Sequence, residues 1–466
     1  MSGHSSMGND PEIGLPNYKN IVKRIFLSGI AAANPEKSIK NFLSKKNGKI
    51  LVRFNDKKKY RSANWKKIII ISFGKAAVPM AMAAKKIIPK SKLKDSIVVT
   101  NYENYKKIPN FSVFGAGHPW PDKNGVKASQ AVLKAVKNAQ KKELVLVLIS
   151  GGGSALLPAP LYNARSNIKI TLTDKIRITK LLLESGATIN EINIIRKKIS
   201  MIKGGKLTLS SHPADLHALI LSDVLGDDLS SIASGPTVPD KTKHRDAKKI
   251  LQKYNIWKNA PKRIISCIED GCNGYIPENY NYSNSPIFKN IGSAIIGSNA
   301  ISLLAAKSMA RKNVKHVEIW DKSLTGEASI QAGKLAKHLK SKSEQIKKYP
   351  IAILAGGEMT VTIKGNGKGG RNQEFALAFA LAADKLKIQK NWTLLSGGTD
   401  GRDGPTDAAG AIVDNFTLQK IKDRGLDPKQ LLRNNNSYKA LKAGNALLST
   451  GATGTNVADL QILLIH

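Results

Sequence analysis

The sequence predicts an α/β protein built on a parallel β-sheet that is covered by helices on both faces. Short, nearly continuous apolar runs alternate with longer stretches in which apolar residues recur at helical spacing. Strands of a parallel sheet are buried on both faces, so they read as unbroken apolar runs rather than alternating ones. A chain of 466 residues is long enough for two or three domains, and we expect a three-layered arrangement.

The predicted strands are the apolar runs at 67–73, 95–100, 144–149, 217–222, 293–297, 351–355, 392–396 and 460–465. The predicted helices include 171–185, 299–311, 327–340 and 371–385. A polar, turn-rich stretch at 240–290 favours a domain boundary there. We therefore expect a flexible tail at 1–16, a first domain over 17–290 and a second domain over 291–466.

The composition excludes several classes of protein. The formal net charge is +40, which suggests nucleic-acid binding at first, but 61 of the 74 basic residues are lysines scattered along the whole chain. Base-reading proteins rely on arginine, so solvated lysine-rich faces explain the charge better. Two cysteines are too few for a disulfide scaffold or a four-thiolate zinc site. Without an apolar signal region or a membrane-length run, we expect a cytoplasmic protein that binds neither nucleic acid nor membranes.

Three of the predicted strands end in residues suited to binding an anionic substrate. In open α/β sheets, ligands bind beyond the carboxyl ends of the strands. Gly74 and Lys75 follow the first strand, and Asp223 follows the strand at 217–222. An acid at this position suits a Mg²⁺ ligand or a base for a hydroxyl group. The run at 144–149 is followed by three glycines and a serine whose N–H groups and hydroxyl suit a phosphate or carboxylate: Gly151, Gly152, Gly153 and Ser154.

Glycine-rich and acidic loops also follow the strands in the second half of the chain. A predicted strand at 359–364 and the helix at 371–385 flank a G-x-G-x-x-G pattern, which fits nucleotide phosphate beside Arg371 better than a dinucleotide. The loop at 394–410 holds three acids and five glycines, as a metal-and-phosphate rim would. The segment at 450–456 is another small, hydroxyl-rich loop. Glycine loops, cations and acids without a dedicated nucleophile indicate phosphoryl transfer. The sequence lacks a Walker nucleotide-binding motif, an H-E-x-x-H metal motif and a G-x-S-x-G nucleophile elbow. His118 could be a ligand, but a single histidine is more typical of a structural residue.

These motifs together resemble the class II glycerate 2-kinases, also called the MOFRL family, from about residue 20 to the C-terminus. The resemblance rests on long motifs in the same order: 74–77, 116–122, 150–160, 184–207, 222–240, 356–374, 398–414, 434–438 and 450–456. It implies an ATP-dependent kinase that phosphorylates D-glycerate to 2-phosphoglycerate with Mg²⁺. It also implies a Rossmann-like N-terminal domain, a smaller C-terminal α/β domain, and an active site in the cleft between them. The oligomeric state stays open, with a homodimer as one option.

The resemblance and the strand ends together define a candidate active site. The family's lysine and aspartate fall on Lys75 and Asp223, and we add Arg371 as a cation for the carboxylate or the transferring phosphoryl group. Besides residues 151–154, the candidate cofactor-binding residues are Gly365, Gly367, Gly369, Gly370, Asn372, Glu374, Thr399, Thr453, Gly454 and Asn456. The candidate metal ligands are Asp400, Asp403 and Asp407.

Three positions depart from the family pattern. Lys198 stands in place of a histidine, Ala452 in place of a proline, and Ala458 in place of an asparagine. If the histidine that other family members have at this position contacts substrate, we expect the substrate preference of this protein to differ from theirs. The alternative functions are a hydroxypyruvate reductase, a label this family has carried, and a basic nucleic-acid-binding protein. The reductase would need a dinucleotide fingerprint with its ribose-binding acid, which the sequence lacks.

Overall fold

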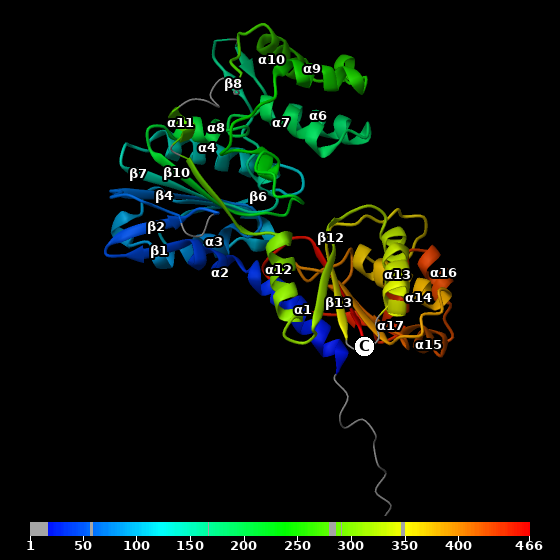
Figure 1. Ribbon diagram of the computed structural model, residues 1–466. Helices are drawn as coiled ribbons and strands as arrows, with labels where there is room; N and C mark the ends of the chain where they lie inside the picture. The colour runs from blue at the N-terminus through cyan, green and yellow to red at the C-terminus, as the bar shows by residue number, and fades with distance from the viewer. Residues whose placement is uncertain (1–16, 56–58, 166, 279–285, 290, 346–349) are drawn as a thin grey trace, which may run out of the picture. The chain divides into compact units, whose positions relative to one another are not determined.

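The computed structural model describes residues 17–466 except 56–58, 166, 279–285, 290 and 346–349 (Figure 1). The predicted tail at 1–16 lies outside the described residues. Contacts divide the chain into two units, which we name for their sheets. The parallel-sheet unit comprises residues 30–302 and 453–458, and the mixed-sheet unit comprises 17–29, 303–452 and 459–466. This division differs from the single break expected within 240–290, because the strand after that stretch joins the first sheet.

The parallel-sheet unit is built on six parallel strands in the order β11-β10-β7-β4-β5-β6, which confirms the predicted α/β class. In chain order these strands are β4 (Lys67–Phe73), β5 (Ile97–Asn101), β6 (Ser112–Ala116), β7 (Glu143–Ile149), β10 (Asp215–Leu221) and β11 (Ile291–Gly297). Sequence analysis found all of them except β6, which is short and only partly buried.

Alternate residues of β4 show why the central strands read as continuous apolar runs. Ile69 and Ile71 belong to one buried cluster with residues of α4 (Lys123–Lys137) and α8 (Lys206–Ser211). Ile68 and Ile70 belong to another, with residues of α2 (Pro35–Phe42) and α3 (Ala77–Ile87). Both faces of the strand are therefore covered, giving helix, sheet and helix as three layers.

The remaining elements of this unit surround the sheet. A three-stranded antiparallel sheet comprises β1 (Leu43–Lys46), β2 (Lys49–Arg53) and β3 (Tyr60–Ser62). A helical lobe has its own buried core and appears as a separate group of helices in Figure 1. Its elements are β8 (Tyr162–Asn163), β9 (Ile168–Lys169), α6 (Leu172–Glu184), α7 (Ile189–Lys198), α9 (His244–Lys253) and α10 (Lys262–Cys272). Short helices complete the unit: α5 (Gly153–Leu156), α11 (Pro286–Lys289), and the 3₁₀ turns η1 (Lys90–Lys92), η2 (Tyr102–Asn104), η3 (Ile232–Ser234) and η4 (Trp257–Asn259).

The second sheet is mixed rather than parallel, with the order β12-β13-β17-β14-β15-β16. The last strand of the chain, β17, pairs antiparallel with both β13 and β14, and only β12 and β13 are parallel neighbours. The strands are β12 (His316–Leu324), β13 (Ile351–Gly357), β14 (Trp392–Gly398), β15 (Gly410–Asp414), β16 (Leu447–Leu448) and β17 (Asp459–Ile465). The second unit is thus an α/β domain, as expected, and its strand directions were left open because an apolar run indicates burial but not strand direction.

Helices pack against the mixed sheet around a second large core that includes Phe375, Phe379 and Trp392. They are α13 (Ala328–Gln345), α14 (Arg371–Lys385), α15 (Thr417–Lys422), α16 (Pro428–Arg433) and α17 (Ser437–Ala443). Two further helices, α1 (Tyr18–Ala32) and α12 (Asn299–Ala310), have residues in both units. The strand predicted at 359–364 does not form; only Thr360 makes a single bridge, to Glu327. Across the described ranges, no helix combines the length and apolarity that a membrane span requires.

Candidate functional site

Lys75 lies at the carboxyl end of β4, beside the glycine loop that follows β7. Gly74 has φ = +123°, and a Cβ there would lie 2.2 Å from Ser150 Oγ, so only glycine fits this close approach. The Lys75 N–H donates to the Gly151 carbonyl at 2.8 Å, and the Ala76 N–H donates to Ser150 Oγ at 3.0 Å. The turn after β4 is thus fastened directly to the turn after β7.

The glycine loop brings Lys75, Asp223 and His118 to one place. A Cβ on Gly151 would lie 2.2 Å from Asp223 Oδ2, and a Cβ on Gly152 would lie 2.9 Å from the His118 ring and 3.4 Å from Lys75 Cγ. The three side chains therefore border two adjacent glycines. The sheet order explains why Asp223, the glycine loop and Lys75 converge, because β10, β7 and β4 are parallel neighbours whose carboxyl ends share one edge. His118 follows β6, another strand of the same parallel sheet.

His118 belongs to this site, although sequence analysis favoured a structural role for it. Burial lowers the pKa of its imidazole, and the positive charge of Lys75 lowers it further. A neutral imidazole beside an ammonium group and a carboxylate can hydrogen-bond a substrate as well as fill space.

The backbone of the loop, rather than the Ser154 hydroxyl, is free to bind an anion. Lys203 Nζ donates to Ser154 Oγ at 3.0 Å, and Ser234 Oγ donates to Asn193 Oδ1 at 3.0 Å. The Ser154 proton therefore goes to Ser234 Oγ, 3.0 Å away. The backbone N–H groups of residues 152–154, by contrast, donate to no acceptor among the described residues. Such groups are the ones that phosphate or carboxylate oxygens bind in glycine loops.

The loop at 364–370 holds the G-x-G-x-x-G pattern, and most of its backbone N–H groups already donate hydrogen bonds within the protein. Gly365 and Gly367 are therefore not positioned to bind a phosphate through their N–H groups, which corrects the role predicted for them. A Cβ on Gly365 would lie 2.6 Å from Asn434 Cα, and one on Gly367 would lie 2.4 Å from the Asn434 carbonyl oxygen. These glycines allow close packing against an asparagine run at 434–436. The N–H donors are Lys364 (2.7 Å) and Gly365 (3.0 Å) to Asn435 Oδ1, Asn366 (3.2 Å) to Asn434 Oδ1, Gly367 (3.0 Å) to the Asn434 carbonyl, and Lys368 (3.3 Å) to Asn436 Oδ1.

The N–H groups of this loop that could receive an anion lie closer to the helix that follows it. The N–H groups of Gly369, Gly370 and Arg371 donate to no acceptor among the described residues. They lie at the N-terminus of the 15-residue helix α14, where unpaired N–H groups and the helix dipole favour negative charge. Glycine is required at 370 because a Cβ would lie 2.3 Å from the Asp403 carboxyl carbon.

Arg371 is held by two carboxylates. Its Nε and Nη2 donate to Asp459 at 2.6 and 3.0 Å, and its Nη1 lies 2.9 Å from Glu358. Burial acts to lower the pKa of the guanidinium, but the hydrogen bonds and charge of Asp459 outweigh it and raise the pKa. Arg371 is thus firmly charged, and two of its five N–H groups remain available for a phosphate.

Asp459 was missed by sequence analysis, although it organises this part of the mixed-sheet unit. It is fully buried at the first position of β17, where it pairs with Gly357 of β13 and Gly398 of β14. Because β17 runs antiparallel to both neighbours, its first residue lies at the edge where they end. The available signal was an acid directly before a buried apolar run, but the strand direction that gives it meaning was unknown.

The three predicted metal ligands have different surroundings and do not form one cluster. Asp403 is buried and accepts the N–H groups of Asn372 and Gln373 at 3.1 and 2.9 Å, so it caps α14. Asp407 is exposed, and a hydrogen bond with Tyr438 lowers its pKa. Asp400 accepts the Arg402 N–H through Oδ1 at 2.9 Å, and no described residue donates to its second oxygen. Within the described residues, no group of three or more His, Cys, Asp or Glu is placed to hold a metal.

Several other candidates have structural surroundings. Asn372 is buried and accepts from Ser396 Oγ at 2.7 Å, and Glu374 is buried and accepts from Asn435 at 3.1 Å. Thr399 is fully buried at the end of β14. The remaining candidates lie on the loop at 453–458, which belongs to the parallel-sheet unit: Thr453 and Asn456 form local hydrogen bonds, and Gly454 has φ = +76° with open space around its Cα.

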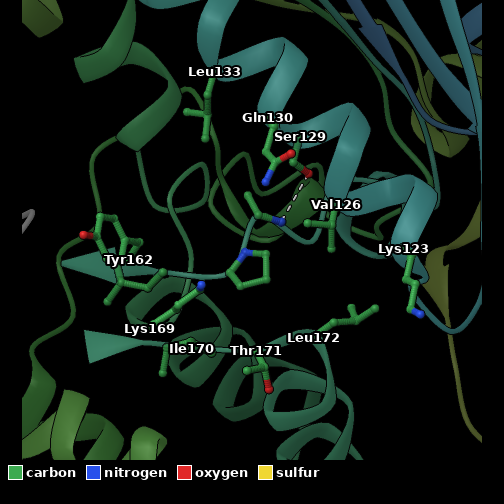
Figure 2. Close-up of a pocket in the computed structure, with 13 residues that line it drawn as sticks. Lys123, Val126, Ser129, Gln130, Leu133, Tyr162, Lys169, Ile170, Thr171 and Leu172 are labelled. Atoms are coloured by element: carbon green, nitrogen blue, oxygen red, sulfur yellow. Dashed lines mark hydrogen bonds between the residues drawn. The ribbon is translucent and has the colours of Figure 1, made fainter. Parts of the chain in front are cut away.

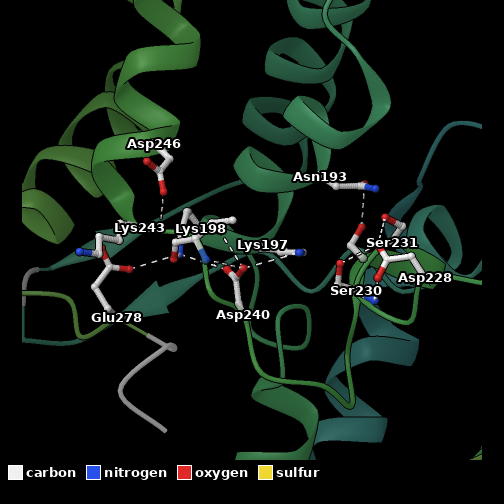
Figure 3. Close-up of polar contacts among 12 residues, drawn as sticks. Asn193, Lys197, Lys198, Asp228, Ser230, Ser231, Asp240, Lys243, Asp246 and Glu278 are labelled. Atoms are coloured by element: carbon white, nitrogen blue, oxygen red, sulfur yellow. Dashed lines mark hydrogen bonds and ion pairs between the residues drawn. The ribbon is translucent and has the colours of Figure 1, made fainter. Parts of the chain in front are cut away.

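Lys198, the first departure from the family pattern, takes part in a network of buried ion pairs (Figure 3). Lys198 is 1% exposed, and its Nζ bonds to Asp240 at 3.1 Å and Glu278 at 3.2 Å. Burial acts to raise the pKa of Glu278, but hydrogen bonds from His244 and the charge of Lys198 outweigh it and lower the pKa to about 2. The Lys198 ammonium is therefore paired inside the protein, which gives no support to an altered substrate preference through this position.

The other two departures differ in consequence. Ala458 has φ = +63°, a left-handed conformation that asparagine or glycine adopts more readily than alanine. Ala452 is exposed, and nothing in the structure explains its replacement of proline.

A cavity of about 650 Å³ lies elsewhere in the parallel-sheet unit (Figure 2). It lies between α4 and the segment at 159–172, and its walls are mainly apolar. None of the predicted site residues lines it. The strand-end cluster is therefore a separate site.

Comparison with known proteins gives the same assignment as the motifs. Residues 21–269 match the family described as Domain of unknown function (DUF4147), and residues 351–459 match the MOFRL family. The chain is 40% identical to the D-glycerate 2-kinase of Thermotoga maritima over 98% of its own length and 99% of that protein. This chain belongs to the glycerate 2-kinase family.

Other members of the glycerate 2-kinase family support the match. The glycerate 2-kinase of Pyrococcus horikoshii is 37% identical, over 96% of this chain and 98% of that protein. A crystal structure of the Thermotoga maritima glycerate kinase superposes with a TM-score of 0.83 at 39% identity, covering 97% of this chain and all of that one. A protein of Agrobacterium vitis named putative hydroxypyruvate reductase is 36% identical, over 96% of this chain and 94% of that protein.

Proposed function

We propose that this protein transfers the γ-phosphoryl group of ATP to the 2-hydroxyl of D-glycerate. The observation that carries the proposal is the convergence of Lys75, Asp223 and the glycine loop at one edge of the parallel sheet. The names of the full-length relatives support the same reaction. ATP as the donor, Mg²⁺ and a cytoplasmic location belong to this proposal.

Each residue of this cluster has a role that its chemistry supports. Asp223 accepts the proton of the 2-hydroxyl as the new O–P bond forms and the bond from the γ-phosphorus to the β-phosphate oxygen breaks. Lys75 and the N–H groups of residues 152–154 stabilise the negative charge on the transferring group, as preorganised donors do in phosphoryl transfer. No covalent enzyme intermediate is needed, because ATP itself supplies the leaving group.

The mixed-sheet unit, taken by itself, also has groups whose chemistry suits phosphate oxygens. Arg371 and the N–H groups of Gly369 and Gly370 are its anion-binding elements. Asp400 would hold Mg²⁺, since this ion usually takes one or two carboxylates together with water and phosphate oxygens. The bound ion would supply positive charge to the phosphates.

Phosphorus NMR of the product tests the proposal directly. Incubation of the protein with ATP, Mg²⁺ and D-glycerate should yield ADP and a new resonance at the chemical shift of authentic 2-phosphoglycerate. A 3-phosphoglycerate resonance would contradict the 2-hydroxyl assignment, and no transfer would contradict the kinase. In parallel, NADH with hydroxypyruvate should show no steady oxidation; steady oxidation would instead support the reductase activity that some relatives are named for.

A further inference from the structure

Arg196, on helix α7, is a cation whose counter-ion the described part of the chain does not provide. The side chain is partly buried, and burial lowers the pKa of the guanidinium. Its Nη1 donates a hydrogen bond to Asn193 Oδ1 at the long distance of 3.5 Å. Among the described residues no carboxylate forms an ion pair with it and Asn193 is its side-chain hydrogen-bond partner, so most of its five N–H groups have no acceptor there.

Two acids near α7, Asp240 and Glu278, are already paired with other cations. Lys197 and Lys198, the next two residues of the helix, bond to Asp240 at 3.5 and 3.1 Å. Lys198 also bonds to Glu278 at 3.2 Å. Arg196 projects from the same turn but takes part in none of these ion pairs. Asp228, a third acid near α7, accepts instead from the hydroxyl groups of Ser230 and Ser231 at 2.8 and 2.6 Å.

Two buried lysines lie close enough to Arg196 for its charge to act on them. Lys175 Nζ donates to the Ile199 carbonyl at 3.0 Å, and Lys203 Nζ donates to the Ser154 carbonyl at 2.8 Å. Burial lowers the pKa of both, to about 7 for Lys175 and well below the ordinary value for Lys203, and the charge of Arg196 contributes to each shift. The lysines bond backbone carbonyls, which accounts for their positions. Arg196 bonds no carbonyl, so such capping does not account for it.

Arg196 is connected to the glycine loop of the candidate active site. Asn193, which accepts its long hydrogen bond, also accepts from Ser234 Oγ at 3.0 Å. Ser234 in turn bonds Ser154 Oγ at 3.0 Å, at the end of the loop. The arginine therefore belongs to the same polar network as the loop that borders Lys75 and Asp223.

We propose that Arg196 binds the carboxylate of D-glycerate. The planar guanidinium matches a carboxylate through two parallel N–H···O bonds, whereas Lys75 and Asp223 suit the hydroxyl and phosphoryl end of the substrate. In this three-carbon substrate the carboxylate is attached to the carbon that carries the reacting hydroxyl, so one residue fixes the acceptor oxygen and selects against alcohols without an acid group. The inference rests on the proposed function and adds the substrate-binding residue to it.

Steady-state kinetics of Arg196→Gln and Arg196→Lys test the inference. Loss of a charged hydrogen-bonding partner should raise the KM for D-glycerate by about 10- to 100-fold for the glutamine variant and less for the lysine variant. The KM for ATP should stay within about twofold. Guanidinium ion added to Arg196→Gln should restore part of the glycerate affinity. Arg177→Gln is the matched control, because Arg177 is an exposed arginine on the neighbouring helix α6.

Calorimetric titration with D-glycerate alone, and with glycerol as the carboxylate-free probe, gives a readout separate from turnover. The wild type should bind glycerate far better than glycerol, and Arg196→Gln should lose most of that difference. An unchanged KM and unchanged selectivity, or a lower kcat with unchanged KM, would overturn the assignment. If the glutamine variant does not fold, the lysine variant decides by the same criteria. Wild-type protein that phosphorylates no glycerate would instead count against the proposed function itself.

Discussion

Substitution of Gly151 by alanine should impair catalysis while leaving the protein folded. The new methyl group would lie 2.2 Å from Asp223 Oδ2 and 2.8 Å from its Cγ. An ordinary contact needs more than 3 Å, so the carboxylate must move by about 1 Å. Gly151 does not have a positive φ, and the atom it would strike ends a short rotatable side chain. The cost in stability should therefore be about 1 kcal/mol or less, as for a strained rotamer.

The expected effect on turnover is larger, because a displacement of about 1 Å in a reacting group costs roughly 10²-fold in rate. The assay is kcat with saturating ATP and D-glycerate, together with thermal unfolding of each variant. Asp223→Asn should lower kcat by about 10²- to 10⁴-fold if the carboxylate takes the hydroxyl proton. Gly333→Ala in α13 is the control, since nothing lies within 4 Å of a Cβ there.

The double variant Gly151→Ala/Asp223→Asn distinguishes the proposed mechanism from a general disturbance of the loop. If the methyl group acts by moving Asp223, it should add little once the carboxylate is gone, and the double variant should resemble Asp223→Asn. Additive losses would mean that the alanine acts elsewhere. Near-normal turnover of Gly151→Ala would refute the close contact between the loop and Asp223 as a requirement for catalysis.

Three further predictions concern the lysine of the candidate site, a strained backbone position and a buried ion pair. Lys75→Ala should lower kcat by ~10²-fold or more through loss of a preorganised charge, whereas the exposed Lys123→Ala should not; equal turnover would exclude that role. Ala458→Gly should raise the free energy of unfolding by about 0.5–1 kcal/mol in a urea titration, because it relieves a positive φ; a loss would show that other contacts dominate. The folded-state pKa of Glu278 is lowered to about 2, so the stability it contributes is present above pH ~4.5 and lost as the pH falls toward 2. The difference in melting temperature between wild type and Glu278→Gln should accordingly shrink across that window, and a constant difference would contradict the assignment.

The first sheet was predictable because burial on both faces leaves a direct mark on the sequence. The run at 67–73 reads as a strand since every second residue enters one of two cores. The same reasoning placed the runs at 351–355 and 460–465 in strands but gave no direction for them. Their antiparallel pairing depends on how the chain returns to the sheet, which is a property of the whole unit.

The residues of the candidate site could be predicted where their role depends on nearby sequence, and not where it depends on partners far along the chain. Lys75, Asp223 and the loop at 151–154 follow parallel strands directly, so strand ends located them. The glycines at 365 and 367 have the same local pattern, yet they contact an asparagine run about 70 residues later in the chain. A glycine that approaches a phosphate and one that packs against another backbone look alike in sequence, because both positions simply exclude a Cβ.

The sequence by itself determined the fold class, the family and the residues that follow the parallel strands, because apolar periodicity and glycine turns are local properties. Tertiary structure decided which polar groups remain available. It assigns Asp459 to Arg371, Asp403 to the cap of α14 and Lys198 to an internal network, and it leaves Arg196 without an acid among the described residues. Partners distant in the chain are chosen by strand order and helix packing, and for a buried charge the identity of its partner sets both its energy and its role.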